Sequence, residues 1–245
     1  RFFTMRQDYK PQKINNFGYP KLLFQLDIIY ADGSRRTVVS DQSWKFTADG
    51  PIRTNNEYDG EEYDATKELE NWSIINYNDY KWLVPQLVKA PEGKIAPQPN
   101  PAMKVMKIIK PNSIKKIKEG NFILDLGKNF AGWLQIKVRG KKGDMVKMRF
   151  AESLQADGEL YVANLRDARV TDVYTLNGKG EEVWHPVFVY HGFRYVEIIG
   201  WPGDPELENF EGHLVFDQMQ TIGSLKTSDE TINQILKNAW WGIAS

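Results

Sequence analysis

The 245-residue chain contains no cysteine, so disulfide bonds and thiolate chemistry are excluded throughout. Its 32 lysine and arginine residues balance 32 aspartate and glutamate residues. Because no net charge results, the chain creates no overall field that would attract nucleic acid or an anionic membrane surface. No stretch comes close to the about 18 consecutive apolar residues that a membrane-spanning helix requires, so no membrane span is expected.

Histidine is also scarce, and its positions do not form a recognised catalytic or metal-binding pattern. His185, His191 and His213 show neither the HExxH spacing of zinc enzymes nor a Ser-His-Asp order. They stand among large aromatic residues in strand-like segments, so we expect them to be hydrogen-bonded strand residues. Arg194, in the same region, is expected to pair with a carboxylate. The glycines of GKKGD lack the strand-to-helix setting of a phosphate-binding loop, so a nucleotide site is not expected.

Aromatic residues, in contrast, are abundant. Eight tryptophans and eleven tyrosines supply rings with one polar end, which suit β-sandwich cores and sugar-stacking surfaces alike. Their number favours a β protein without choosing between these uses. Five tryptophans stand among apolar strand residues and are interpreted as core residues rather than sugar platforms: Trp72, Trp82, Trp133, Trp184 and Trp201.

Most of the chain alternates between apolar and polar residues with a period of two, which is typical of half-buried β-strands. Residues 20–46 contain two such stretches around Asp32-Gly33, a pair that favours a hairpin turn. The stretch APEGKIAPQPNP, at residues 90–101, holds four prolines and no periodicity, so it marks a domain boundary. Regularly spaced strands follow over residues 121–219. We therefore predict a mostly β protein with two antiparallel, jelly-roll-like β-sandwich modules.

The last twenty residues have a different period. Apolar residues recur there at three- and four-residue steps, which predicts one face of a helix: Ile232, Ile235, Leu236, Ala239, Trp240 and Ile243. Thr227 and Glu230 have the spacing of a capping box, so we expect the helix to span residues 227–241. A helix this short is marginal alone in water, and its apolar face is therefore expected to pack against the second sandwich.

A polar loop over residues 54–64 is the candidate ligand site. It gathers oxygen-bearing side chains of the kind that contact sugars or calcium, together with one tyrosine ring: Asn55, Asn56, Glu57, Tyr58, Asp59 and Glu61. The spacing is not that of an EF-hand, so calcium in this loop is only one possibility and no other cofactor is expected. The alternative is the solvated end of a hairpin, in which Asn55 and Asn56 cap local backbone amides.

The same loop contains clustered carboxylates at Asp59, Glu61, Glu62 and Asp64. Two carboxyl groups about 5 to 10 Å apart can hydrolyse a glycosidic bond. Such a pair requires one carboxyl with a raised pKa in a dry pocket, and a solvated acidic turn does not supply one. We therefore expect no catalytic residue in this loop.

Several long blocks, in order from about residue 17 to the end of the chain, resemble the bacterial α-L-rhamnosidase family: GPIRTNNEYDGEEYDAT, NWSIINYNDYKW, DLGKNFAGWLQIKVRGKKGD, RFAESLQADGELYVANLRDARVTDVYTLNG, WHPVFVYHGFRYVEIIGWPG and GSLKTSDETINQILKNAWWG. The resemblance implies two β-sandwich modules followed by an (α/α)6 barrel. It implies a division into residues 1–94, 95–222 and 223–245, the last being the opening helix of that barrel. Because the first residues, RFFTMRQDYK, read as neither a signal peptide nor a natural start, the first module is expected to be incomplete at its start.

Members of that family release terminal α-L-rhamnose with inversion, using two glutamates inside the barrel. The resemblance therefore implies that the parent protein is a glycosidase and that this chain carries no catalytic residue. It further implies a rhamnose-containing glycoside or polysaccharide as substrate and the missing barrel of the same chain as partner. For a bacterial enzyme that degrades polysaccharides, a periplasmic or extracellular location is favoured.

The first module also resembles a carbohydrate-binding module in which calcium helps to hold rhamnose through an Asp-Asn pair. This chain has Asn55 at the position of the aspartate, and the missing carboxylate weakens a calcium site. Three functions stay open at this point. The chain is an ancillary part that shapes the active site of a barrel, a module that itself binds rhamnose, or a structural spacer without a ligand.

Overall fold

The computed structural model describes residues 21–89, 93 and 96–244, which form two compact units. Of the described residues, the N-terminal unit comprises 21–51, 67–89, 93, 96 and 97. The sheet unit comprises residues 52–66 and the chain from residue 98 onwards. The chain is mostly β, with one C-terminal helix. No helix in the described part is long and apolar enough to cross a membrane.

The N-terminal unit is built around the predicted hairpin. Strands β1 (Gln25–Ile29) and β2 (Arg35–Val39) pair antiparallel, and Gly33 adopts a φ of 84° in the turn between them. Phe46 and Leu83 form an isolated bridge elsewhere in the unit. Among its described residues no second sheet covers the hairpin, and none of the buried apolar side chains of the described chain belongs to this unit. The described part of the unit therefore consists of a hairpin with irregular segments.

The sheet unit contains a ten-stranded sheet that runs in the order β3-β4-β11-β8-β13-β7-β14-β5, with β6 and β12 also pairing with β7. Its strands are β3 (Ile52–Asn56), β4 (Gly60–Asp64), β5 (Met103–Ile109), β6 (Ser113–Lys118), β7 (Asn121–Arg139), β8 (Met145–Ala151), β11 (Thr171–Thr175), β12 (Glu181–Trp184), β13 (His191–Ile199) and β14 (Phe210–Asp217). The short strands β9 (Ser153–Leu154) and β10 (Leu160–Tyr161) pair with each other, and single 3-10 turns lie at η2 (Ala65–Lys67), η3 (Ala163–Leu165) and η4 (Leu207–Asn209).

Strand β7 organises this sheet, because its two halves have different neighbours. Residues 121–125 pair with β6 and β13, whereas residues 130–139 pair with β13, β14 and β12. The change occurs next to Gly127, whose φ of 79° bends the strand. Asp125 stabilises the bend, because its carboxylate accepts hydrogen bonds from the Gly127 amide and from the Arg194 guanidinium. The expected pairing of Arg194 with a carboxylate is thus confirmed.

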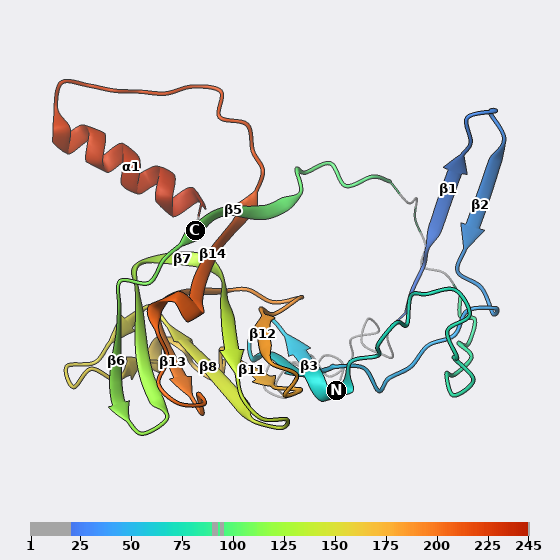
Figure 1. Cartoon of the computed structure of the whole chain (residues 1–245). Helices are drawn as coiled ribbons and strands as arrows, with labels where there is room; N and C mark the ends of the chain where they lie inside the picture. Colours follow the sequence, from blue (N-terminus) through green and yellow to red (C-terminus); the bar gives the residue numbers. More distant parts are fainter. Residues whose placement is uncertain (1–20, 90–92, 94–95, 245) are drawn as a thin grey trace. The chain divides into compact units, whose positions relative to one another are not determined.

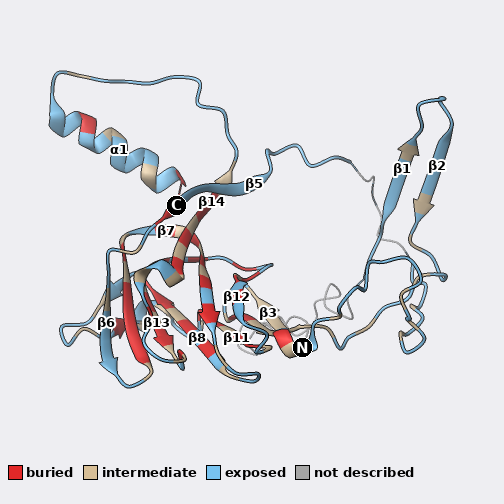
Figure 2. Cartoon of the chain, in the orientation of Figure 1, coloured by how far each residue is buried: buried red, intermediate tan, exposed pale blue. Residues whose placement is uncertain are grey.

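The core of the sheet unit follows the predicted alternation of strand residues. Along the second half of β7, every second residue is buried, and Figure 2 shows buried residues concentrated on the strands of this unit. Four phenylalanines are fully buried at its centre: Phe130, Phe150, Phe193 and Phe210. The ring of Phe193 lies 4.6 Å from Phe130 and 4.8 Å from Phe150. Burial of each such side chain stabilises the fold by about 1.5 to 3 kcal/mol.

Strands β3 and β4 belong to this sheet, although the predicted division at residue 94 groups them with the first module. β4 pairs in parallel with β11, with Val173 opposite Glu62 and Thr175 opposite Asp64, and the remaining strand pairs of the sheet are antiparallel. A long-range parallel pairing leaves no local mark in the sequence, because turn residues and periodicity report only on neighbours along the chain.

The C-terminal helix α1 spans Glu230–Ala244, three residues later at each end than predicted. Asp229, not Thr227, caps it, since the Asp229 carboxylate accepts hydrogen bonds from the amides of Thr231 and Ile232. The Thr227 backbone instead pairs with the side chain of Asn233.

The expected docking of the apolar face of α1 is wrong. Ile232, Ile235 and Trp240 are 44%, 60% and 51% exposed. The helix contacts the sheet at its C-terminal end instead, where the Trp241 indole donates a hydrogen bond of 2.7 Å to the Asn129 carbonyl. Figure 1 shows helix α1 joined to β14 by a long segment without regular structure. Because Trp241 lies about 100° around the helix from Trp240, docking through Trp241 leaves most of the predicted face in solvent. Of that face, the Trp240 ring lies 6.1 Å from the Phe216 ring of β14, and Leu236 is half-buried.

Candidate functional site

The turn between β3 and β4, together with the strand ends on either side of it, contains the residues predicted to contact a ligand. The Asn56 side-chain oxygen accepts hydrogen bonds from the amides of Tyr58 and Asp59, at 3.0 and 2.8 Å. This local capping is the arrangement expected for a hairpin end and is confirmed for Asn56. Gly60 follows with a φ of 102°, and a Cβ at this position would lie 2.2 Å from the Thr171 carbonyl oxygen. Only glycine therefore permits the turn to approach β11 so closely.

Asp59 fastens this turn to the segment that precedes β11. The Arg169 amide and guanidinium both lie 3.3 Å from the same Asp59 oxygen. Burial by itself would raise the pKa of Asp59, but the hydrogen bonds from Arg169 and Asn56 outweigh burial and lower this pKa below its ordinary value. Backbone bonds from Val170 to Tyr58 and from Thr171 to Asp59 complete the contact.

Glu61 is fully buried on β4 and its carboxyl group is surrounded by donors. The Asn55 side-chain amide donates a hydrogen bond of 2.7 Å to one Glu61 oxygen. Asn55 therefore binds the Glu61 side chain and does not cap a backbone amide, although the hairpin alternative predicts such a cap. The amides of Val187 and Phe188 donate to the carboxyl group at 3.0 and 3.2 Å. Burial raises the pKa of Glu61, and the nearby negative charge of Asp172 adds to this rise.

Glu61, Asp172 and His191 form what we call the buried acidic cluster. Asp172 accepts a hydrogen bond from the Glu61 amide at 2.9 Å, and its same oxygen lies 3.1 Å from the His191 ring nitrogen. Glu61 and Asp172 are both 0% exposed, and His191 is 4% exposed. A carboxyl with a raised pKa beside a second carboxylate is typical of a glycosidase acid. No substrate can reach these groups, so the cluster fastens β3 and β4 to β11 and β13.

The remaining predicted residues of the turn face solvent. Glu57 is exposed, and the Tyr58 ring is 53% exposed. Asn55, Asn56, Asp59 and Glu61 are instead engaged with neighbouring side chains and amides. Within the described chain, no group of three or more acidic or histidine side chains has the arrangement of a metal site. Glu57 and Tyr58 are therefore the members of the set that a ligand can reach.

The three histidines are hydrogen-bonded residues on or beside strands, as predicted. His191 contacts Asp172, His213 accepts a hydrogen bond of 3.2 Å from the Trp133 indole, and a His185 ring nitrogen lies 2.8 Å from the Pro186 carbonyl oxygen. The tryptophans differ from one another. Trp184 and Trp201 are buried at 6% exposure each, and Trp82 and Trp133 are half-buried. Trp72 is 62% exposed, so its assignment to the core is wrong.

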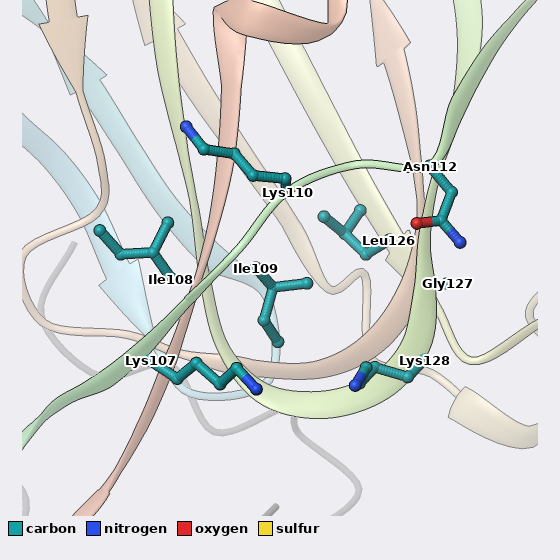
Figure 3. Close-up of a pocket in the computed structure, with 8 residues that line it drawn as sticks. All are labelled: Lys107, Ile108, Ile109, Lys110, Asn112, Leu126, Gly127 and Lys128. Carbon is teal, nitrogen blue, oxygen red and sulfur yellow. The ribbon is translucent and has the colours of Figure 1, made fainter.

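A second feature was missed in the sequence. A pocket of about 240 Å³, which we call the lysine pocket, lies where β5 and the turn after it approach the bend of β7 (Figure 3). It is lined by Lys107, Ile108, Ile109, Lys110, Asn112, Leu126, Gly127 and Lys128. These residues come from two segments that meet through the pairing of β5 and β7 with β14 and of β6 with β7, so no local motif signals the pocket.

Comparisons with known proteins agree on one family. The profile of the α-L-rhamnosidase N-terminal domain matches residues 2–107, and that of the bacterial α-L-rhamnosidase concanavalin-like domain matches residues 115–216. An α-L-rhamnosidase of Streptomyces avermitilis is 37% identical over 225 residues, which are 91% of this chain and 22% of that protein. One from Formosa agariphila is 36% identical over 227 residues, covering 91% of this chain and 24% of that protein.

Solved structures give the same result. The α-L-rhamnosidase of Dictyoglumus thermophilum matches with a TM-score of 0.87 and 40% identity, covering 93% of this chain and 26% of that one. The Streptomyces avermitilis enzyme, solved in complex with L-rhamnose, matches with a TM-score of 0.84 and 36% identity, covering 90% of this chain and 21% of that one. The chain thus spans about a quarter of the length of the proteins that it matches.

Proposed function

This chain belongs to the bacterial α-L-rhamnosidase family, and we propose that it is the non-catalytic β-sandwich portion of an enzyme that releases terminal α-L-rhamnose. The observation that carries the proposal is the match of two adjacent family domains within a chain that covers about a quarter of its relatives. The substrate is a rhamnose-containing glycoside or polysaccharide, in keeping with the name of every relative compared and with L-rhamnose in one related structure.

The chemistry of the carboxyl groups supports a non-catalytic role. Glycoside hydrolysis requires two carboxyl groups on either side of an accessible bond. The one pair in the described chain that combines proximity with a raised pKa, Glu61 and Asp172, is sealed within the sheet. Asp59 is held by Arg169 with a lowered pKa, which suits neither a general acid nor a base near neutral pH.

The partner that we propose is a helical catalytic barrel in the same protein. Helix α1 presents an apolar face to solvent, with Ile235 at 60% and Ile243 at 72% exposure. Single exposed apolar residues are common on protein surfaces. Several exposed apolar residues on one face of a helix, however, are typical of a surface that packs against another element. A second helix packed along Ile232, Ile235 and Ile243 would complete it.

A second candidate function is direct binding of the sugar by the turn between β3 and β4. It is favoured by the exposure of Glu57 and Tyr58, because a tyrosine ring with a polar neighbour can pack on a sugar face. In this alternative, calcium would have to compete with Arg169 for the Asp59 carboxylate. A spacer without any ligand is the third alternative.

A chimera tests the proposed function. In the Dictyoglumus thermophilum enzyme, the segment that matches this chain is either deleted or replaced by residues 1–245. We expect the deletion to abolish hydrolysis of p-nitrophenyl α-L-rhamnopyranoside and the replacement to restore it. The 245-residue chain alone should show no turnover. A folded chimera without activity, or turnover by the chain alone that is lost in Glu61→Gln, would overturn the proposal.

A further inference from the structure

The lysine pocket combines an apolar floor with a cationic rim. Ile109 and Leu126 form the floor and are 5% and 1% exposed. Lys107, Lys110 and Lys128 stand at the rim and are exposed. No carboxylate is among the eight lining residues. The pocket therefore carries an excess of positive charge in a chain whose overall charge is zero.

The three lysines differ in their partners. Lys110 forms an ion pair of 2.5 Å with Glu211, and in Figure 3 its side chain points away from those of Lys107 and Lys128. The ammonium ends of Lys107 and Lys128 point toward each other across the pocket (Figure 3). In the part of the chain that the structure describes, neither forms a salt bridge with a carboxylate. Two converging cations repel each other, and an anion between them converts this repulsion into attraction.

The surrounding contacts hold these groups in place. The Lys128 ammonium lies 4.6 Å from the centre of the Trp241 ring, a cation–π contact that restricts the side chain. The Asn112 amide donates a hydrogen bond of 2.8 Å to the Asp125 carbonyl, which ties the turn after β5 to the bend of β7. At Gly127 a Cβ would lie 2.3 Å from the Asn112 side-chain nitrogen, so glycine leaves room for this amide at the pocket wall.

We propose that the lysine pocket binds a pyranose unit that carries a carboxylate or sulfate group. The anionic group lies between Lys107 and Lys128, and the ring lies above Ile109 and Leu126. Because these two side chains are almost fully covered by their neighbours, the two ammonium groups supply most of the affinity. The volume is below the range of about 300–1,000 Å³ typical of drug-sized sites, so it suits one sugar unit. This inference rests on the proposed function, because that function makes the ligand a saccharide, and the two lysines make an acidic saccharide the class that this pocket would bind.

Titrations of the folded 245-residue chain, followed by NMR, test the site. The probes are D-glucuronate and D-glucose 6-sulfate, with neutral D-glucose and inorganic sulfate as comparisons. The reporters are the Gly127 amide and the Trp241 indole N–H. We expect saturable shifts with at least one anionic sugar, at an affinity about tenfold above those of glucose and sulfate, since one charge-assisted contact is worth about a factor of ten. The tighter of the two anionic sugars identifies the anionic group.

Two matched double variants distinguish binding by the lysine pocket from a general effect of the net charge on affinity. Lys107→Gln combined with Lys128→Gln should weaken binding about tenfold or more. Lys104→Gln combined with Lys147→Gln removes the same charge from exposed strand positions outside the pocket and should leave the affinity within about twofold. Equal losses in both double variants, no binding of either sugar, or inorganic sulfate binding as tightly as the sugars would overturn the proposal.

The two proposals fail in different ways. The chimera assay uses a neutral substrate, so it does not depend on the lysine pocket. An inactive folded chimera together with saturable glucuronate binding would contradict the proposed function but not the pocket proposal. An active chimera without binding of either anionic sugar would contradict the pocket proposal but not the proposed function.

Discussion

Glu61 shows how burial decides what a carboxyl group does. Its raised pKa and its position beside Asp172 resemble the environment of a glycosidase acid. Its oxygens, however, accept hydrogen bonds from Asn55, Val187 and Phe188, and none of its surface is exposed. The residue therefore joins β4 to the neighbouring β3 and to the distant segment at residues 187–188, and its function is structural.

Replacing Glu61 tests this role. In Glu61→Gln the amide nitrogen faces at least one backbone N–H, so a buried donor is left unsatisfied and the free energy of unfolding should fall by about 1 to 3 kcal/mol. Urea denaturation at pH 7 measures the change. Glu62→Gln, on the same strand but half-exposed, is the control and should stay within about 0.5 kcal/mol of the original chain. Equal stability of both variants would contradict the role.

The same variant makes a pH prediction. Because the folded-state pKa of Glu61 is raised, the folded protein binds a proton that the unfolded chain has already released. The contribution of this residue to stability therefore falls as the pH rises from the ordinary glutamate pKa through the raised one. In Glu61→Gln this part of the pH dependence should disappear.

At the scale of elements, helix α1 shows that the residues that form a helix differ from the residue that docks it on the sheet. Its apolar period and an aspartate at position 229 suffice to start and maintain the helix. Its contact with the sheet depends on other residues, because Trp241 binds the Asn129 carbonyl and lies under the Lys128 ammonium. The helix thus contacts the sheet at one end and leaves Ile232, Ile235 and Ile243 exposed.

Hydrogen exchange tests which residue docks the helix. Trp241→Ala should lower the protection of the amides in residues 236–244, because it removes the hydrogen bond to Asn129 and the ring packing. We expect a loss of about 1 to 2 kcal/mol in the free energy of opening. Ile235→Ala is the control on the exposed face and should change protection by less than about 0.5 kcal/mol. The reverse order of effects would show that the helix docks through the apolar face.

At the scale of the whole molecule, the two units differ in how they are stabilised. The sheet unit contains all the buried apolar side chains found among the described residues, whereas the N-terminal unit exposes apolar residues such as Leu22 at 66% and Ile75 at 89%. The chain spans about a quarter of the length of its relatives. The proposed ancillary role, in which the sheet unit would support a catalytic domain, agrees with this distribution.

Calorimetry with the 245-residue chain tests whether the turn between β3 and β4 binds the neutral sugar L-rhamnose. Because Asn56, Asp59 and Glu61 are occupied by local contacts, we expect no heat on titration with L-rhamnose, with or without calcium. The chain must be shown to be folded by its amide spectrum. Saturable heat that is lost in Tyr58→Ala would favour the sugar-binding alternative over the ancillary role without a ligand.

Local rules determined much of this protein from the sequence alone. The hairpin around Gly33, the alternation along β7, the existence of a C-terminal helix and the capping by Asn56 follow from turn chemistry and periodicity. These signals depend only on a few neighbouring residues, so they predict the same local structure whatever the rest of the chain does. The resemblance of the long blocks to one family extended these local rules to the fold class.

Only the tertiary structure decided which segments meet. The parallel pairing of β4 with β11 moved Glu61 from a predicted solvated turn into the sheet. The common pairing of β5 and β7 with β14 placed Lys107 and Lys128 around one pocket. The physical reason is the same in both cases. Burial and electrostatic environment depend on contacts between residues far apart along the chain, and these contacts follow from strand order and register, which no short stretch of sequence encodes.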